Sequence, residues 1–298
     1  MAGPTSLQTV QMAVAAVSLP VYVLFLVTIV RKRNQVPINS PFFALSFGLG
    51  IFDVASVLNK WFTVYCVGQG WLVDLGREAD GSVARIVIMS TTYFTWVQAL
   101  GVTALAANRC TALVLYTRYT DLWTGARVSQ TLAAILVISA VPMVPYFQWQ
   151  FEYVFDNFTG EKTAIIWTCS RCQEHIYLFF LVTCSIFAVI LITLYSLTFW
   201  TIHKRAQEVQ DFVIEDNLSR KAETNMSIIG LCVTFAYLLV VVHIWGLATL
   251  GVRNVFWWRY FVAVWAVASD VLSLCNPWLC FLLCKDVRVS MLRVAKCN

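Results

Sequence analysis

The sequence predicts an all-α integral membrane protein with seven transmembrane helices, and two observations carry this prediction. The chain has 298 residues, of which 59% are hydrophobic and only 12% are charged. Soluble domains carry about 25% charged residues, so this chain has too little polar surface to face water along its length. Its apolar runs reach the roughly 20 residues that a helix needs to cross about 30 Å of hydrocarbon, whereas strands of a membrane barrel alternate over segments of about 10 residues.

Seven apolar runs define the expected spans, and short loops join them. Pro142 and Pro145 lie near the end of the fourth run, where a kink is tolerated within lipid. We expect one seven-transmembrane domain over residues 1–284, with no separate soluble domain, followed by a tail over residues 285–298. The expected helices are roughly 7–30, 41–67, 84–108, 128–149, 175–202, 223–250 and 257–284.

The expected orientation follows from the basic residues of the loops, which accumulate on the cytoplasmic side of membrane proteins. Fourteen of the 21 Lys and Arg residues fall on one side of the predicted spans and seven on the other. The richer side includes the carboxyl tail, so we expect the tail in the cytoplasm and the amino terminus outside. The net charge of +5 then belongs to the inner membrane surface, and we expect no nucleic-acid partner.

The tail has the pattern of a short amphipathic helix. Val287, Met291 and Val294 follow one another at the i, i+4 and i+7 positions, with most basic residues off that line. This pattern predicts a cytoplasmic helix that lies on the inner leaflet. Cys284 and Cys297 are candidates for palmitoylation at the membrane boundary.

Three of the ten cysteines, Cys66, Cys169 and Cys172, fall at or near the predicted outer face, where a disulfide can persist. A bridge from Cys66 to one of the two loop cysteines is one interpretation. The CSRC spacing of the loop pair also occurs in zinc sites, but the loop lacks the other ligands that a zinc site needs. Asn157 begins an Asn-Phe-Thr glycosylation acceptor in the same loop, and matching triplets at Asn217 and Asn225 are expected to face the cytoplasm or the membrane.

Two short motifs lie at the predicted cytoplasmic ends of the third and seventh spans. Asn108 and Arg109 close an apolar stretch that has no other charge back to Arg85. Pro277 removes a backbone hydrogen bond from the seventh helix, and Asn276 beside it can satisfy the freed groups or reach a neighbouring helix. The arginine can simply extend its charge to water, or it can pair within the bundle and contact a cytoplasmic partner.

These motifs resemble those of rhodopsin-like G-protein-coupled receptors, in which an acidic-Arg-aromatic triplet ends helix three and Asn-Pro-x-x-Tyr ends helix seven. The arginine of Asn108-Arg109-Cys110 and the Asn276-Pro277 pair match, whereas the flanking acid and the tyrosine do not. The usual cysteine at the outer start of helix three and the Trp-x-Pro of helix six are also missing. The seventh span holds no lysine, which excludes a retinal Schiff base there.

The departures resemble instead the nematode chemosensory serpentine receptors of the Srg superfamily, most nearly the Srv class. The resemblance covers nearly the whole chain and rests on NSPFFALSFGLGIFDVASVLNKW over residues 39–61, on ANRCTAL after the third span and on NPWLCFLLCKDVR after the seventh. It implies a chemosensory receptor of the plasma membrane, in sensory-neuron cilia, that binds a small molecule at its outer face and activates a heterotrimeric G protein at its inner face. It further implies coupling and switching roles for Asn108, Arg109, Asn276 and Pro277. Since Asn108 replaces the acid, we expect a hydrogen bond or a more distant acid, Asp121 or Glu223, to hold the resting state.

Two acids lie deeper than the helix ends. Asp53 and Asp270 fall near mid-membrane in the second and seventh spans, since each helical residue rises about 1.5 Å. Intramembrane acids usually mark a functional site, so the two carboxyl groups could share a cation or a proton. The alternative is a single protonated acid bonded to a neighbouring helix. Lys60, at the i+7 position from Asp53, is a competing partner.

The expected ligand site lies in the outer halves of the third, sixth and seventh spans. Aromatic rings with sparse hydroxyl groups suit a small, partly apolar ligand, although tryptophans also form belts at the membrane interface. The candidate ligand-binding residues are Thr91, Thr92, Thr95, Trp96, His243, Trp245 and Trp265.

An enzyme is not expected from this sequence. His175, His203 and His243 lie at the outer face, at the inner face and within the sixth span, so they cannot converge on one metal. We expect neither a metal nor a cofactor. The alternative function is a small membrane transporter that uses the buried acids for ion coupling, although transporters are usually built from repeats with helices broken at mid-membrane, and neither feature is evident.

Overall fold

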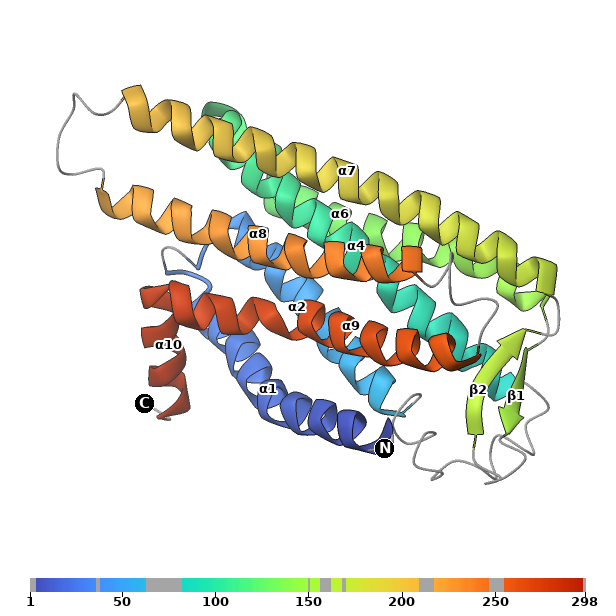
Figure 1. Cartoon of the computed structure of the whole chain (residues 1–298). Coiled ribbons are helices and arrows are strands. Elements are labelled where there is room, and N and C mark those ends of the chain that lie inside the picture. Colours follow the sequence, from blue (N-terminus) through green and yellow to red (C-terminus); the bar gives the residue numbers. More distant parts are fainter. Residues whose placement is uncertain are drawn as a thin grey trace.

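The chain forms a membrane bundle of long helices that run side by side (Figure 1). The computed structural model describes residues 4–35, 38–62, 82–149, 151–155, 162–167, 170–208, 217–246 and 255–296. Within them six helices are each long and apolar enough to cross a membrane, and the bent pair of α9 and α10 counts as a seventh span. The long helices are α1 (Pro4–Lys32), α2 (Pro41–Lys60), α4 (Ser82–Val114), α6 (Gly125–Ala140), α7 (Ser170–Glu208), α8 (Asn217–Gly246) and α9 (Val255–Leu283), and α10 is Lys285–Ala295.

Short elements connect some of these helices. The turn after α4 holds the 3-10 helix η2 (Tyr116–Arg118) and α5 (Tyr119–Leu122). The strands β1 (Phe151–Phe155) and β2 (Lys162–Trp167) pair as an antiparallel hairpin between α6 and α7. The hairpin was not expected from the apolar runs, because its strands are short, although both are rich in the aromatic and β-branched residues that favour strands. It lies at the opposite end of the bundle from α10 (Figure 1), and the two ends are called here the hairpin end and the α10 end.

Helix α4 occupies the centre of the bundle, because it contacts α2, α6, α7 and α8. A small residue allows the closest of these approaches. A Cβ atom added at Gly101 of α4 would lie 2.5 Å from Cδ2 of Leu49 on α2. Helices in lipid associate largely through such close packing at small residues, so Gly101 helps to set the distance between α2 and α4.

We expect the substitution Gly101→Val to destabilise the bundle by about 1–3 kcal/mol, because the branched side chain overpacks the interface with α2. The thermal unfolding midpoint of the detergent-purified protein measures this effect. Gly125→Ala is the matched control, since a Cβ atom at Gly125 meets nothing within 4 Å. Equal unfolding midpoints for both variants would contradict the assigned role of Gly101.

Several expected helix ends need correction. Helix α7 extends beyond the expected 175–202 at both ends, and α8 begins at Asn217 rather than at residue 223. The third span was expected to end at Asn108, but α4 continues to Val114, so Arg109 lies inside the helix. No glycine or proline interrupts this region, and the Thr111 hydroxyl donates to the backbone oxygen of Ala107 at 2.8 Å within the continuing turn. The fourth span was expected to run to residue 149 as one helix. Instead α6 gives way at residue 141 to the 3-10 helix η3 (Val141–Phe147), where the two prolines lack the backbone donors of an α-helix.

The predicted amphipathic helix after the seventh span is confirmed as α10, which bends by 101° from the end of α9. Its apolar line is buried in the protein, with Val287 only 1% exposed and Met291 fully covered. Contacts with α1 and α9 cover it. The line therefore packs on the bundle rather than on a leaflet, which corrects the expected placement. Arg288 donates from Nη1 to the backbone oxygen of Leu282 at 3.1 Å and so caps the end of α9.

Candidate functional site

A chain of buried polar side chains crosses the middle of the bundle, and Asp53 of α2 lies at one end of it. Tyr22 of α1 donates its hydroxyl to Oδ2 of Asp53 at 2.7 Å. Gln98 of α4 donates Nε2 to Oδ1 of the same carboxyl group at 3.1 Å. Both carboxyl oxygens of this intramembrane acid are therefore bonded by neighbouring helices, as a polar group in a dry environment requires.

A buried ion pair lies at the other end of the same chain. Lys60 of α2, only 3% exposed, places Nζ 2.7 Å from Oδ1 of Asp270 on α9. The ammonium group also donates to the hydroxyl of Ser269 at 3.1 Å. Two charges taken out of water cost free energy unless they are paired and further hydrogen-bonded, and both conditions are met here.

Gln98 and Ser273 link these two ends. Gln98 donates Nε2 to the Ser273 hydroxyl at 2.5 Å, and this hydroxyl donates to the backbone oxygen of Ser269 at 2.8 Å. The result is a central polar network that joins α1, α2, α4 and α9. Asp53 and Asp270 thus belong to one network but bond to different partners. Lys60 pairs with Asp270 rather than with Asp53.

A small cavity adjoins this network. It has a volume of about 20 Å³, and Asp53, Gln98 and Asn276 supply its polar lining. A cavity needs roughly 10–15 Å³ to hold one water molecule. The space beside Asp53 therefore suits a single species of about that size.

Arg109 lies inside the bundle near the α10 end. Its guanidinium carbon lies 3.6 Å from the centre of the Phe42 ring of α2, a distance typical of a cation–π contact. The side chains of Tyr195 on α7 and Cys280 on α9 lie within electrostatic range of Arg109. Its Nε is buried and has no hydrogen-bond acceptor within the described ranges. The side chain therefore packs against neighbouring helices instead of extending into water.

Asn108 supplies a second buried donor beside it. Its side chain is fully covered, and its Oδ1 accepts a hydrogen bond from the Tyr119 hydroxyl at 3.3 Å. Burial raises the pKa of Tyr119 above its ordinary value, so this hydroxyl keeps its proton at neutral pH. Nδ2 of Asn108 has no acceptor among the residues described. No ion pair joins Arg109 to Asp121, which is exposed in the same described part of the chain.

The Asn276-Pro277 motif meets this region from α9, which stays helical through Pro277. Asn276 is buried, and its Oδ1 accepts a weak hydrogen bond from the Cys280 thiol at 3.7 Å. Cys280 is also one of the groups that interact with the charge of Arg109. The two motifs that the sequence places far apart therefore meet at the α10 end, through one turn of α9.

Comparison with known proteins identifies this architecture. The family described as serpentine type 7TM GPCR chemoreceptor Srv matches residues 11–297. The chain belongs to the Srv family. A Caenorhabditis elegans protein, Serpentine receptor class V-1, is 29% identical over 171 residues, which cover 57% of this chain and 54% of that protein. The chain thus spans about half the length of this relative.

The ligand-site candidates of this Srv receptor are spread over several interfaces. Trp96 is 5% exposed and packs against the rings of Phe179, Phe180 and Phe187 on α7. The Thr92 hydroxyl lies 3.4 Å from that of Tyr146. Thr91 and Thr95 are half-buried on α4, and Thr95 donates to the backbone oxygen of Thr91 at 2.9 Å.

The candidates on α8 and α9 lie elsewhere. His243 is buried within α8, whereas Trp245 is about half exposed and donates Nε1 to the hydroxyl of Ser185 on α7 at 3.0 Å. The side chain of Trp265 lies outside the described part of α9. None of the candidates whose side chains are described lines the cavity beside Asp53.

Several other expected features of the receptor fall outside the described residues. These are the disulfide candidates Cys66 and Cys169, the side chain of Cys172, the glycosylation site Asn157, the side chain of Glu223 and the palmitoylation candidate Cys297. Cys284 is described, and it lies half-buried at the bend between α9 and α10.

Sequence reasoning missed three residues of the site. Gln98 could have been found, because a polar amide in the middle of an apolar run is itself a signal of function in a membrane helix. Tyr22 and Phe42 carry no such signal, since aromatic residues are common in membrane helices. Their roles depend on which helices pack together, which spacing along one helix does not reveal.

Proposed function

We propose that this Srv receptor binds a small molecule near its hairpin end and activates a heterotrimeric G protein at its α10 end. The hairpin end is then the outer face, the α10 end is cytoplasmic, and the receptor resides in the plasma membrane of sensory cilia. The observation that carries the proposal is the position of Arg109, stacked on Phe42 beside the Asn276-Pro277 turn without an acidic partner in the described chain.

Buried donors without acceptors make this end a docking site for a partner. Nε of Arg109 and Nδ2 of Asn108 are both buried and have no hydrogen-bond acceptor among the residues described. Each such group costs about 1–3 kcal/mol, and a segment that brings carbonyl or carboxylate oxygens to this end would remove that cost. A G-protein segment supplies acceptors of this kind, so its binding would favour a state in which Arg109 leaves Phe42.

The central polar network is the element that connects the two ends. It bonds α1, α2, α4 and α9 to one another, and its Gln98 lies between the candidate residues Thr91 to Trp96 and Arg109 along α4. Pro277 weakens α9 one turn beyond the network. The part of α9 toward the α10 end can therefore move while the part toward the hairpin end stays fixed. We propose that ligand binding shifts this network, and that the cavity beside Asp53 holds one water molecule or a small cation.

The proposed ligand is a small, partly apolar molecule. Thr92, Trp96 and His243 are half-buried or buried members of the candidate set, and their rings and hydroxyl group suit such a compound. Ligand-stimulated nucleotide exchange on an added G protein tests the function directly, with purified receptor in lipid vesicles and a panel of small molecules. Uptake of a labelled solute by the same vesicles, without stimulated exchange, would favour the transporter instead.

Glycosylation tests the proposed orientation. We expect a glycosidase-sensitive shift in mass when the receptor is expressed in eukaryotic cells, because Asn157 falls between β1 and β2 along the chain and begins an acceptor triplet. The substitution Asn157→Gln alone should abolish the shift. Asn217→Gln is the matched control and should leave it unchanged, since this second acceptor begins α8 at the other end. Modification of Asn217 would invert the orientation.

A further inference from the structure

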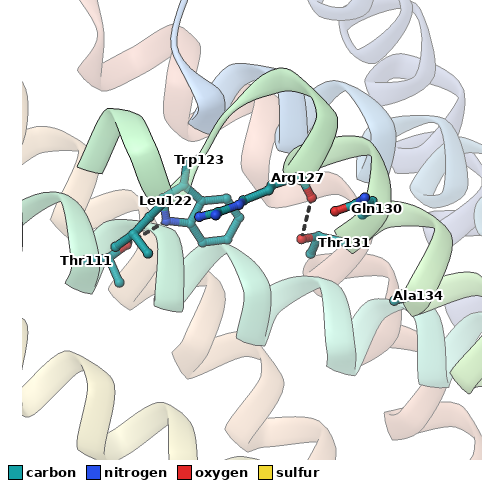
Figure 2. A pocket seen from close by; sticks show the side chains of 7 residues that line it. All are labelled: Thr111, Leu122, Trp123, Arg127, Gln130, Thr131 and Ala134. Atoms are coloured by element: carbon teal, nitrogen blue, oxygen red, sulfur yellow. Dashed lines mark hydrogen bonds between the residues drawn. The ribbon is translucent and has the colours of Figure 1, made fainter. Parts of the chain in front are cut away.

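A pocket opens at the α10 end of the bundle, between α4, α5 and the start of α6. Its volume is about 500 Å³, and its lining includes Thr111, Trp123, Arg127, Gln130, Thr131 and Ala134. Figure 2 shows the Arg127 side chain extending from α6 toward the turn that holds Leu122 and Trp123. Neither the central polar network nor Arg109 contributes to this pocket, so the proposed coupling mechanism leaves it unexplained.

Hydrogen bonds hold the two walls of the pocket in place. Trp123 donates Nε1 to the Thr111 hydroxyl at 2.8 Å, which fixes the turn after α4 against α4 itself. Arg127 donates Nη1 to the backbone oxygen of Asp121 at 2.8 Å. This single bond orients the guanidinium group and leaves its other donors for a ligand. A fork of donors held in this way is the group that proteins use most effectively to bind phosphate oxygens.

The lining has a donor-rich part and an apolar part. Arg127 supplies its only charge, and the Gln130 amide lies near it on α6. The Thr131 hydroxyl donates to the backbone oxygen of Arg127 at 2.8 Å, so it can only accept a hydrogen bond from a ligand. Beyond Ala134, Val137 of α6 is 68% exposed and Val141 of η3 is 62% exposed, and both belong to one candidate membrane-spanning segment. A molecule with an anionic head and an apolar chain can therefore place its head on Arg127 and its chain along α6.

We propose that this pocket binds the phosphate headgroup of an anionic phospholipid in the leaflet at the α10 end. The proposal rests on the proposed function only in taking this end as the cytoplasmic one, where anionic lipids are concentrated. Basic pockets between membrane helices on that side are suited to anionic headgroups, and Trp123 is a residue typical of this depth. The lipid joins α6 to the turn after α4, next to the Asn108–Tyr119 contact.

The binding of dioleoyl phosphatidic acid to the full-length receptor in detergent, followed by native mass spectrometry, tests this assignment. Dioleoyl phosphatidylcholine serves as the zwitterionic reference. Arg127→Gln should weaken binding of phosphatidic acid about tenfold, since it removes a charge-assisted hydrogen bond. Ala134→Trp should weaken it comparably by filling the pocket without changing the charge. Arg118→Gln is the matched control, because this exposed arginine of η2 lies outside the lining, and it should retain binding within about twofold.

Three outcomes would overturn the proposal. Equal losses for Arg118→Gln and Arg127→Gln would mean that the lipid senses only the diffuse charge of this face. Competition by glycerol 3-phosphate at the concentration of the lipid would assign the pocket to a soluble phosphate. A loss of nucleotide exchange by Arg127→Gln in vesicles of phosphatidylcholine alone would assign it to the G protein. The lipid measurement needs neither ligand nor G protein. Failure of the proposed function can therefore be distinguished from failure of the lipid-binding proposal.

Discussion

Replacement of Arg109 by lysine is expected to leave surface expression near normal and to lower ligand-stimulated nucleotide exchange at least severalfold. Lysine keeps the positive charge, so a residue that only extended to water would tolerate the change. The guanidinium group, however, lies over the Phe42 ring, with its carbon 3.6 Å from the ring centre, and carries a planar fork of donors. A compact ammonium group reproduces neither the stacking nor the paired donor geometry.

The measurement is receptor-dependent nucleotide exchange, normalised to the receptor at the cell surface. Arg118→Lys is the matched control, because Arg118 is an exposed arginine of the neighbouring turn and should tolerate the same exchange of residue. If Arg109→Lys and the unmodified receptor gave equal exchange, Arg109 would be a boundary charge and the proposed coupling site would lose its main support.

Replacement of Lys60 by methionine is expected to have the largest effect on stability. The substitution removes the ammonium group 2.7 Å from the buried carboxyl group of Asp270. Loss of one partner of a buried ion pair costs about 3–5 kcal/mol. We therefore expect a large drop in the thermal unfolding midpoint of the detergent-purified receptor and reduced surface expression.

The double variant Lys60→Met with Asp270→Leu separates the charge from the packing. Removing both charges and keeping apolar volume is often neutral for a buried pair, so the double variant should recover most of the lost stability. A double variant as unstable as Lys60→Met alone would show that the lysine stem, rather than the ion pair, carries the effect. The two bonded oxygens of Asp53 are untouched in either variant.

The sequence was sufficient to predict the spans and the tail helix, because both depend on patterns within one segment. Length and hydropathy set the spans, and the apolar spacing of Val287, Met291 and Val294 is the pattern that α10 buries. Patterns of this kind did not predict the β1–β2 hairpin or the end of α4. Strands of five or six residues give a weak signal beside apolar runs, and a charge such as Arg109 does not end a helix that has no breaker after it.

Part of the candidate site was predictable by residue but not by partner. Asp53 and Asp270 were identified from their depth and Lys60 from its i+7 spacing to Asp53, yet their pairing depends on the rotation of α2 and α9 about their axes. Phe42 lies on a different helix from Arg109, and no spacing along either helix reveals that the two meet. Contacts of this kind are set by packing between helices, and a sequence alone carries only the preferences of each helix.

The 101° bend between α9 and α10 has a practical consequence for anyone who shortens or labels this receptor. Val287 and Met291 belong to the same buried cluster as Phe25 and Ile29 of α1. Deletion of the last turns of α10 would expose apolar surface on α1 and weaken the packing of α9. If a truncated receptor failed to signal, the cause would then be the damaged bundle. The loss of signalling should not be assigned to a lost binding motif in the tail. Fluorescent reporters are better joined through a flexible spacer placed after residue 296, where the helix has ended.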